Sequence, residues 1–285
     1  MPSLSILKAG LMTSVQDMGR SGLAYYAIPS SGVMDRKSAR KALAFLMQDD
    51  TYPLIECTSV APHIRFNNAV QIALAGADFA WTLNNIPIAA NGLLGVESGD
   101  ILKGKFARKA MRAYIAINGK WKIKKVYDSY STYPNAKIGG LKGRLLQVGD
   151  TLEWENNPPV IATKNANQGI VAERKILIRK GPEFDYLSTA ARQTLVTTSY
   201  KIGTDSNRMG IRLLGKRLES STYQLQHSLA TLPGFVQLPP SGLPIVLLRD
   251  GQISGGYPRI AYLPDASINQ ISQIPLGEIF KFEMR

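Results

Sequence analysis

The sequence predicts a mainly β protein with a few short helices. Short apolar or alternating runs recur along the chain at the spacing of strands in barrels and sandwiches. Turn signals such as Asn118-Gly119, Gly139-Gly140 and Asp250-Gly251 separate these runs. With 285 residues, 45% of them apolar, the chain is long enough to bury a core without a metal or a disulfide.

Eight segments carry the strand pattern. Each is a short apolar or alternating run that ends at glycine, proline or a polar turn residue. They are Ala69–Ala77, Ala113–Ile117, Arg144–Val148, Lys175–Ile178, Phe235–Leu238, Ile245–Leu248, Arg259–Leu263 and Glu278–Phe282.

Three segments predict helices. Asp35–Met47 places its apolar residues on one face, and Asp35 is placed to cap the helix. In Phe184–Leu195 an apolar residue recurs every four positions, and Asp265 is a suitable N-cap for Ala266–Gln273.

A domain boundary is expected near residue 160. Glu155–Pro159 ends in two prolines, and Thr163–Gly169 is polar and rich in asparagine, so neither stretch favours a central strand. The predicted domains are residues 1–160 and 161–285.

Cysteine and histidine usage limits the chemistry. Cys57 is the single cysteine, so neither an internal disulfide nor a cysteine-rich zinc site is possible. His63 and His227 are far apart in sequence, and no metal site is predicted. The first residues do not resemble a signal peptide, and the longest apolar run, Pro244–Leu248, is too short to cross a bilayer. A cytoplasmic protein without a membrane span is expected.

The positive charge is regional. The formal net charge is +13, and twelve basic residues against one acidic residue give Lys103–Arg144 a charge of +11. Such a segment either attracts polyanions, acidic proteins or small anions, or is simply a solvated basic face. Because zinc-finger spacing, a recognition helix and RNA-binding aromatic motifs are all missing, nucleic acid is not expected as a partner.

Familiar catalytic signatures are missing, including phosphate-binding loops and the nucleophile elbow. Polar clusters flanked by glycine are present instead, and each combines a carboxylate or a guanidinium with a backbone that a ligand can approach. Taken one at a time, each is equally explained as a turn or a local ion pair. The clusters are Gln16–Arg20, Ser30–Asp35, Ser206–Leu213 and Asp250–Pro258.

Taken in order, these clusters resemble the biotin-dependent carboxyltransferase-like family, which includes allophanate hydrolase subunit 2, KipA and the 5-oxoprolinase C subunit. The resemblance covers nearly the whole chain. Its strongest stretches are Asn207–Leu213, Pro233–Pro239, Gly242–Ile245, Asp250–Gln252 and Gly255–Pro258. Further matching stretches are Thr13–Arg20, Ser31–Asp35, Ile55–Thr58, Gly76–Asp78, Ser131–Tyr133, Ile138–Gly140, Gly149–Asp150 and Gly181–Pro182.

The resemblance implies two cyclophilin-like β-barrel domains. It also implies the C subunit of an ATP-dependent 5-oxoprolinase, a hydrolase of a cyclic amide that is active only in a complex with the A and B subunits. The B subunit is a KipI-like protein that resembles allophanate hydrolase subunit 1. ATP would act through the complex, and attached biotin is not expected, because the chain has no biotin-attachment domain. The alternatives are a KipA-like regulator that binds a kinase inhibitor, and a carboxyltransferase module acting on urea or another amide.

For the hydrolase, we expect arginine to bind an anionic group, while carboxylates and amides orient the substrate. Arg208 is predicted to hold the anion and Asp250 to orient the substrate or act as a base. The predicted catalytic residues are Asp17, Arg208 and Asp250, and the predicted substrate-binding residues are Gln16, Arg20, Asp35, Arg212, Gln252 and Tyr257.

The chain departs from the family pattern in three places. Where relatives commonly carry Gly-Ser-Arg-Ser-Thr, residues 128–132 read Asp-Ser-Tyr-Ser-Thr, so an arginine and a glycine are replaced. The usual Gly-Asn after the first helix reads Gln48-Asp49-Asp50, and a glycine is replaced by Ala61. The missing arginine leaves the substrate open.

Overall fold

Strands make up most of the regular structure in the computed structural model, which describes residues 1–160, 169–219 and 227–285. The described residues form two compact units. Unit 1 contains Met1–Arg20 and Ser31–Val171, and unit 2 contains Ser21–Ser30 and Ala172–Arg285. The prediction of a mainly β fold with a few short helices is confirmed.

The two units follow each other along the chain, except that one segment of the N-terminal part belongs to unit 2. Ser21–Ser30 belongs to unit 2, where the Ser30 hydroxyl donates to the carbonyl of Arg249 at 3.5 Å. The predicted boundary at residue 160 lies directly before residues 161–168, which are outside the described residues, as is most of the expected linker Thr163–Gly169.

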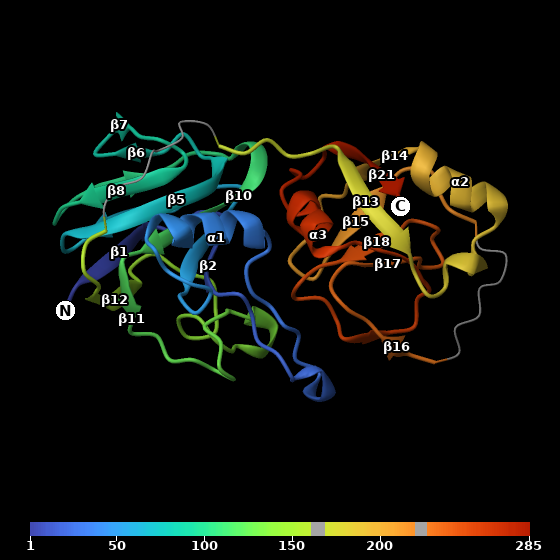
Figure 1. The fold of residues 1–285 in the computed structure, drawn as a ribbon, viewed down its shortest axis with the longest axis horizontal. Helices are drawn as coiled ribbons and strands as arrows, with labels where there is room; N and C mark the ends of the chain where they lie inside the picture. Colours follow the sequence, from blue (N-terminus) through green and yellow to red (C-terminus); the bar gives the residue numbers. More distant parts are fainter. Residues whose placement is uncertain (161–168, 220–226) are drawn as a thin grey trace. The chain divides into compact units, whose positions relative to one another are not determined.

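Unit 1 contains two sheets (Figure 1). One has the order β11-β12-β1-β4-β9-β6-β7, and the other has the order β2-β3-β10-β5-β8. The strands of the first are β1 Ser3–Lys8, β4 His63–Phe66, β6 Thr82–Leu83, β7 Ile86–Pro87, β9 Ile101–Lys103, β11 Gly119–Trp121 and β12 Thr151–Asn156. Those of the second are β2 Met12–Gln16, β3 Leu54–Thr58, β5 Val70–Asp78, β8 Gly92–Val96 and β10 Arg108–Ile117.

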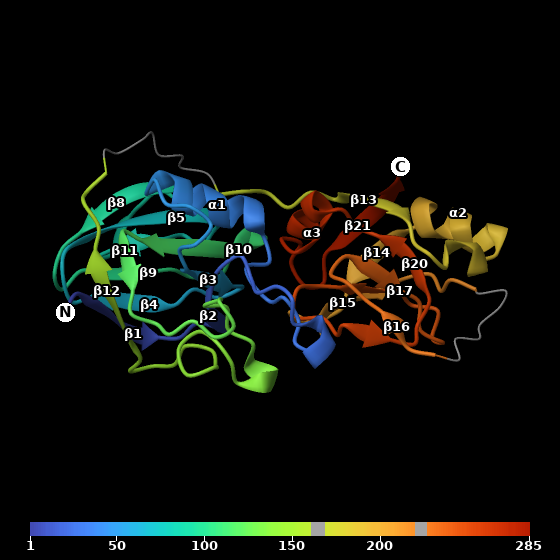
Figure 2. The ribbon, with the colours of Figure 1, turned by 60° about the horizontal axis from the view of Figure 1, so that its bottom comes forward.

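Unit 2 is built on a closed barrel, with α2 packed against β21 and α3 against β13 (Figure 2). The barrel closes because β13 pairs with β21 in parallel and with β20 in antiparallel orientation. Its strands, in barrel order, are β13 Lys175–Lys180, β20 Arg259–Tyr262, β17 Phe235–Gln237, β18 Ile245–Leu247, β15 Gly210–Leu214, β14 Ser199–Ile202 and β21 Ile279–Met284. A separate two-stranded ribbon contains β16 Leu229–Ala230 and β19 Ser254–Gly255.

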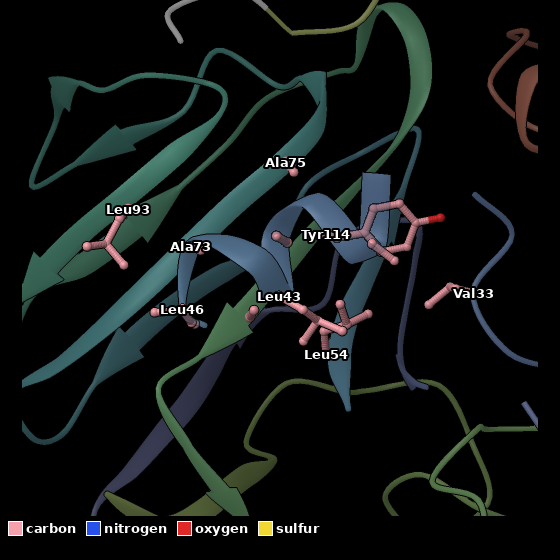
Figure 3. Packing of buried hydrophobic residues seen from close by; sticks show 11 residues of the cluster. Val33, Leu43, Leu46, Leu54, Ala73, Ala75, Leu93 and Tyr114 are labelled. Atoms are coloured by element: carbon pink, nitrogen blue, oxygen red, sulfur yellow. The ribbon is translucent and has the colours of Figure 1, made fainter. Parts of the chain in front are cut away.

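The helical segments are short. They are α1 Arg36–Phe45, α2 Thr189–Thr197 and α3 Asp265–Ile271, with 3-10 turns η1 Ala24–Tyr26, η2 Pro134–Ala136 and η3 Phe184–Tyr186. In unit 1, α1 covers one face of the sheet that contains β5 and β10 (Figure 3). Leu43 and Leu46 of this helical face are fully buried together with Leu54, Ala73 and Tyr114. This helix explains the burial of Tyr114 and Ala116, which lie on the face of β10 that it covers.

The predicted strand Arg144–Val148 is wrong. The chain turns there, and Arg144 donates to both carboxylate oxygens of Asp150, at 2.7 and 2.8 Å. Six residues of extended strand would separate the two by roughly 20 Å, so this ion pair requires a bent chain.

Two helix predictions need correction at their ends. The segment Phe184–Leu195 is broken at Leu187, because the Ser188 hydroxyl caps a new helix by accepting from the amide of Ala191 at 3.1 Å. Asp265 is the first residue of α3 rather than its cap, and its carboxylate pairs with Arg249 at 3.1 Å.

Asp35 caps α1, as predicted from the sequence. Its carboxylate accepts from the amide of Ser38 at 3.1 Å and from the Ser38 hydroxyl at 2.6 Å. We expect Asp35→Ala to lower the free energy of unfolding by about 1–2 kcal/mol and Asp35→Asn to cost much less, because asparagine also caps helices. Urea denaturation measures both. Equal losses in the two variants would contradict a capping role, and Glu153→Ala, at an exposed strand position, is the control.

Glu183 makes the stability of unit 2 sensitive to acid. Burial alone would raise the pKa of its carboxyl group, but hydrogen bonds from Arg259, at 2.6 to 2.9 Å, outweigh burial and hold the pKa below its ordinary value of 4.5. A lowered carboxyl pKa contributes stability above the unfolded value and loses it as the pH falls through the folded value.

We therefore expect Glu183→Gln to be less stable than the parent protein at neutral pH, with a difference that shrinks as the pH falls below 4.5. Urea denaturation across this range measures the difference. A difference that stays constant on acidification would exclude this linkage.

Candidate functional site

The candidate site is a pocket of about 390 Å³ in unit 2. This volume is within the usual range for small-molecule sites. Three of the predicted residues, Arg212, Gln252 and Tyr257, line it. The structure adds Asp205, Asn207 and Gln237, which the sequence prediction had not selected.

The floor of the pocket is a row across three neighbouring strands. Arg212 of β15 lies opposite Ile245 of β18, which in turn lies opposite Gln237 of β17. Ile211 and Leu213 are buried in the barrel, so Arg212 and its row face outward, since side chains alternate along a strand. The site therefore lies on the outer surface of the barrel wall.

Two glutamine side chains meet in this pocket. The Gln252 amide nitrogen lies 3.4 Å from Gln237 Oε1, and Gln237 is only 1% exposed although it belongs to the outward row. A Cβ on Gly255 would lie 2.5 Å from the Gln252 nitrogen and 2.9 Å from that of Gln237. The backbone at Gly255 thus packs closely on the two amides, and a larger residue there would have to displace them.

Arg212 is held only loosely. Its guanidinium pairs with Asp205 at 3.1 Å, and both side chains are more than half exposed. Because an exposed ion pair contributes about 1 kcal/mol or less, an anionic ligand can replace Asp205 as the partner of Arg212. The pocket thus combines an available guanidinium with carboxamides and a phenol, which can bind and orient a small amide that carries a carboxylate.

Arg208 and Asp250 lie together in unit 2 as a buried ion pair. Arg208 Nε donates to Asp250 Oδ2 at 2.7 Å and Nη2 donates to Oδ1 at 3.1 Å, with both side chains at most 6% exposed. The amide of Asp250 also donates to the carbonyl of Arg208 at 3.1 Å. The pair joins the loop before β15 to the loop that carries Gln252, so the geometry favours a positioning role. The catalytic roles of Arg208 and Asp250 stay predictions.

In unit 1 the predicted residues gather around the segment with the replaced arginine. The Asp17 carboxylate accepts from the Ser129 hydroxyl at 2.7 Å, from the amide of Tyr130 at 2.6 Å and from the Ser131 hydroxyl. Arg20 Nη2 donates to the carbonyl of Ser131. These bonds fold residues 129–131 against the turn after β2.

The other two predicted residues of unit 1 are buried. Gln16 ends β2, and its amide nitrogen donates to the Ser14 hydroxyl at 2.9 Å and to the carbonyl of Thr132 at 3.2 Å. Asp35 is 3% exposed and caps α1. Unit 1 thus brings Gln16, Asp17 and Arg20 into contact with residues 129–132, whereas Asp35 caps α1 and does not belong to this group.

Gln237 was missed because its role depends on register. In sequence it is one polar residue in the strand Phe235–Gln237, and only the pairing with β18 puts it beside Arg212. Asn207 and Asp205 lie in or next to the cluster Ser206–Leu213, so proximity to that cluster was the available signal.

In the described ranges, no three histidine, cysteine, aspartate or glutamate residues gather as metal ligands. No helix in these ranges is both long and apolar enough to span a membrane.

Comparison with known proteins identifies the family of the chain. The model of the carboxyltransferase domain, subdomains A and B, matches residues 26–284. The chain belongs to this carboxyltransferase family. The match includes most of both units. Of the predicted site residues, Gln16, Asp17 and Arg20 lie outside it, and the others lie within it.

Relatives of this carboxyltransferase-family chain include enzyme subunits and parts of larger enzymes. It is 33% identical to the 5-oxoprolinase C subunit of Escherichia coli, over 98% of this chain and 90% of the relative. It is 28% identical to urea amidolyase of Saccharomyces cerevisiae, over 98% of this chain but 16% of that protein. The crystal structure of Kluyveromyces lactis urea carboxylase matches with a TM-score of 0.90 at 27% identity, over 98% of this chain and 27% of that one.

The buried pair makes a prediction about stability. We expect Arg208→Met or Asp250→Leu alone to lower the free energy of unfolding by about 3–5 kcal/mol, since each leaves a buried charge without its partner. The double variant should lose less than the sum, and a double-mutant cycle in urea measures the coupling. Arg212→Met and Asp205→Leu, which break the exposed pair, are the controls and should cost about 1 kcal/mol or less. Additive losses at Arg208 and Asp250 would show that the pair does not stabilise the loops.

Proposed function

We propose that this chain is the C subunit of an ATP-dependent 5-oxoprolinase that converts 5-oxoproline to glutamate together with the A and B subunits. The observation that carries the proposal is the 33% identity to the C subunit of the Escherichia coli 5-oxoprolinase over nearly the full length of both chains. A second relative of the same name, from Haemophilus influenzae, is 31% identical over 98% of this chain.

The chemistry of the pocket in unit 2 supports a lactam as the ligand. 5-Oxoproline is a small ring with one carboxylate and one amide. In the proposal Arg212 binds the carboxylate, and Gln252 and Gln237 hydrogen-bond the ring amide. Arg208 and Asp250 hold the two loops in place, and Tyr257 and Asn207 complete the lining.

The partners supply what these side chains do not. Carboxamides and a guanidinium bind and orient, but they do not exchange protons near neutral pH. Phosphoryl transfer from ATP to the lactam oxygen would make the ring carbon electrophilic. Addition of one water then breaks the C–N bond, which leaves an amino group and an acyl phosphate, and a second water releases glutamate and phosphate. ATP acts through the complex with the A subunit and the KipI-like B subunit, in the cytoplasm, and no biotin is attached to this chain.

A second candidate is carboxyl transfer to urea or a related amide. The match to a carboxyltransferase domain and the similarity to urea amidolyase favour it. The same pocket chemistry suits urea, which has an amide but no carboxylate. Arg212 therefore separates the two candidates, because only 5-oxoproline offers it an anion.

We expect the purified chain, mixed with the A and B subunits and ATP, to form glutamate from 5-oxoproline. Arg212→Gln should lower kcat/KM for 5-oxoproline by about ten- to a hundredfold, mainly through KM, because one charge-assisted hydrogen bond is lost. Glutamate formation measured against substrate concentration tests both statements.

Arg174→Gln is the matched control, because Arg174 also pairs with a carboxylate, Glu278, at 3.0 Å and is similarly exposed. Complex formation without glutamate would overturn the proposal and favour a regulator of the KipA kind. Carboxylation of urea without glutamate would favour the second candidate.

A further inference from the structure

A second pocket, of about 320 Å³, lies in unit 1 within the basic part of the sequence. Lys120 and Lys125 line it together with Tyr52, Pro53, Trp121 and Tyr130. The proposed reaction does not use this pocket, since the candidate site lies in unit 2.

The two lysines of this pocket lack carboxylate partners. Neither forms an ion pair with any described residue. Lys120 lies opposite Glu155 in the pairing of β11 with β12, yet the Glu155 carboxylate binds Lys122 at 3.0 Å. The ammonium group of Lys125 lies 5.1 Å from the centre of the Tyr130 ring.

The acidic residues closest in sequence to the pocket are also occupied. Asp49 accepts from the amide of Thr51 at 2.9 Å and from its hydroxyl at 2.5 Å. Asp50 binds the Arg40 guanidinium through both oxygens. Asp128, the one acidic residue of the basic segment, does not line the pocket. Neither lysine of the pocket is therefore paired with a carboxylate of the described residues.

The remaining walls are aromatic and held in place. Trp121 is 5% exposed and packs against Trp154, with ring centres 6.5 Å apart. The Tyr52 hydroxyl accepts from Asn157 at 3.4 Å, and the Tyr52 ring is half-buried beside the buried Pro53. Trp121 thus supports the wall from behind, and a flat group can pack against the half-buried Tyr52 ring at little cost in side-chain entropy.

We propose that this pocket binds a phosphomonoester that carries a flat group, such as a nucleoside monophosphate. A phosphomonoester has a charge of about −1.5 to −2 at neutral pH, which matches two lysines better than a single carboxylate does. The phosphate lies between Lys120 and Lys125, and the flat group lies toward Tyr52. This binding site is separate from the proposed lactam site and needs no other protein.

The test is calorimetric titration of the full chain with AMP, in the absence of 5-oxoproline and of other proteins. AMP should bind, inorganic phosphate should bind more weakly, and adenosine should bind weakest, because it lacks the charge. Lys120→Ala and Lys125→Ala should each raise the Kd for AMP by about tenfold, the effect of one charge-assisted hydrogen bond. Both side chains are exposed, so the variants should fold.

Lys105→Ala is the matched control. It removes the same charge from the same basic segment, and Lys105 is exposed and does not line the pocket, so the Kd of this variant for AMP should match that of the parent chain. No binding of AMP, or equal weakening by all three substitutions, would overturn the proposal. Binding of a single-stranded oligonucleotide without binding of AMP would also overturn it and assign the surface to nucleic acid. None of these results depends on lactam cleavage, so the two proposals can fail separately.

Discussion

The buried ion pair between Arg208 and Asp250 is the interaction on which the pocket of unit 2 depends. Neither charge tolerates burial alone, because removing an ion from water costs several kcal/mol unless a partner compensates. The pair therefore forces the loop before β15 and the loop after β18 to stay together. The same junction is closed by backbone bonds, in which the amide of Leu248 donates to the carbonyl of Met209 at 2.9 Å. A Cβ on Gly251 would lie 2.9 Å from that carbonyl oxygen, which explains the glycine.

Unit 1 also contains a buried carboxylate, and it is stabilised by neutral hydrogen-bond donors. The buried Asp17 carboxylate receives hydrogen bonds from two serine hydroxyls and from backbone amides, so its charge is stabilised without an arginine at residue 130. Tyr130 takes that position and contributes its amide there, while its ring faces Lys125. Residues 129–131 are therefore anchored to Asp17 with tyrosine at residue 130.

Much of the fold could be predicted because local pattern and tertiary contact agree. Residues 70–78 and 113–117 are apolar runs that form strands of one sheet, and α1 packs against both strands. The helix α1 could be predicted from its single apolar face and from its cap. The turn at Arg144 could not be predicted, because the apolar run after Arg144 resembles a strand and the sequence does not show that Arg144 pairs with Asp150. Strands of two residues, such as β6 and β19, exist only through their partners and leave no periodic signal.

The candidate site followed the same rule. Residue type and glycine context identified Arg212, Gln252 and Tyr257, because a ligand-binding loop needs both. The same criteria also selected Asp17, Asp35 and the Arg208–Asp250 pair, whose side chains are buried and bonded within the protein. Sequence shows that a charged residue is present but not which partner it finds, and partner choice separates a binding group from an anchor. Gln237 shows the reverse case, since its place beside Arg212 comes from strand register alone.

The ion-pair partners of individual side chains also change the interpretation of the basic segment Lys103–Arg144. Its charge of +11 in sequence suggests one uniform surface, but the structure divides it. Arg112 is buried and Arg144 binds the buried Asp150, so these two charges serve the fold, whereas the pair of Lys122 with Glu155 is exposed. Several exposed lysines, among them Lys105 and Lys109, have no carboxylate partner in the described part of the chain, and Lys120 and Lys125 are two that line a pocket with aromatic residues. A long polyanion needs a continuous row of available cations, whereas two lysines at one pocket suit a single small anion. The placement of Lys120 and Lys125 at one pocket, rather than the total charge of the segment, therefore favours a small ligand over nucleic acid.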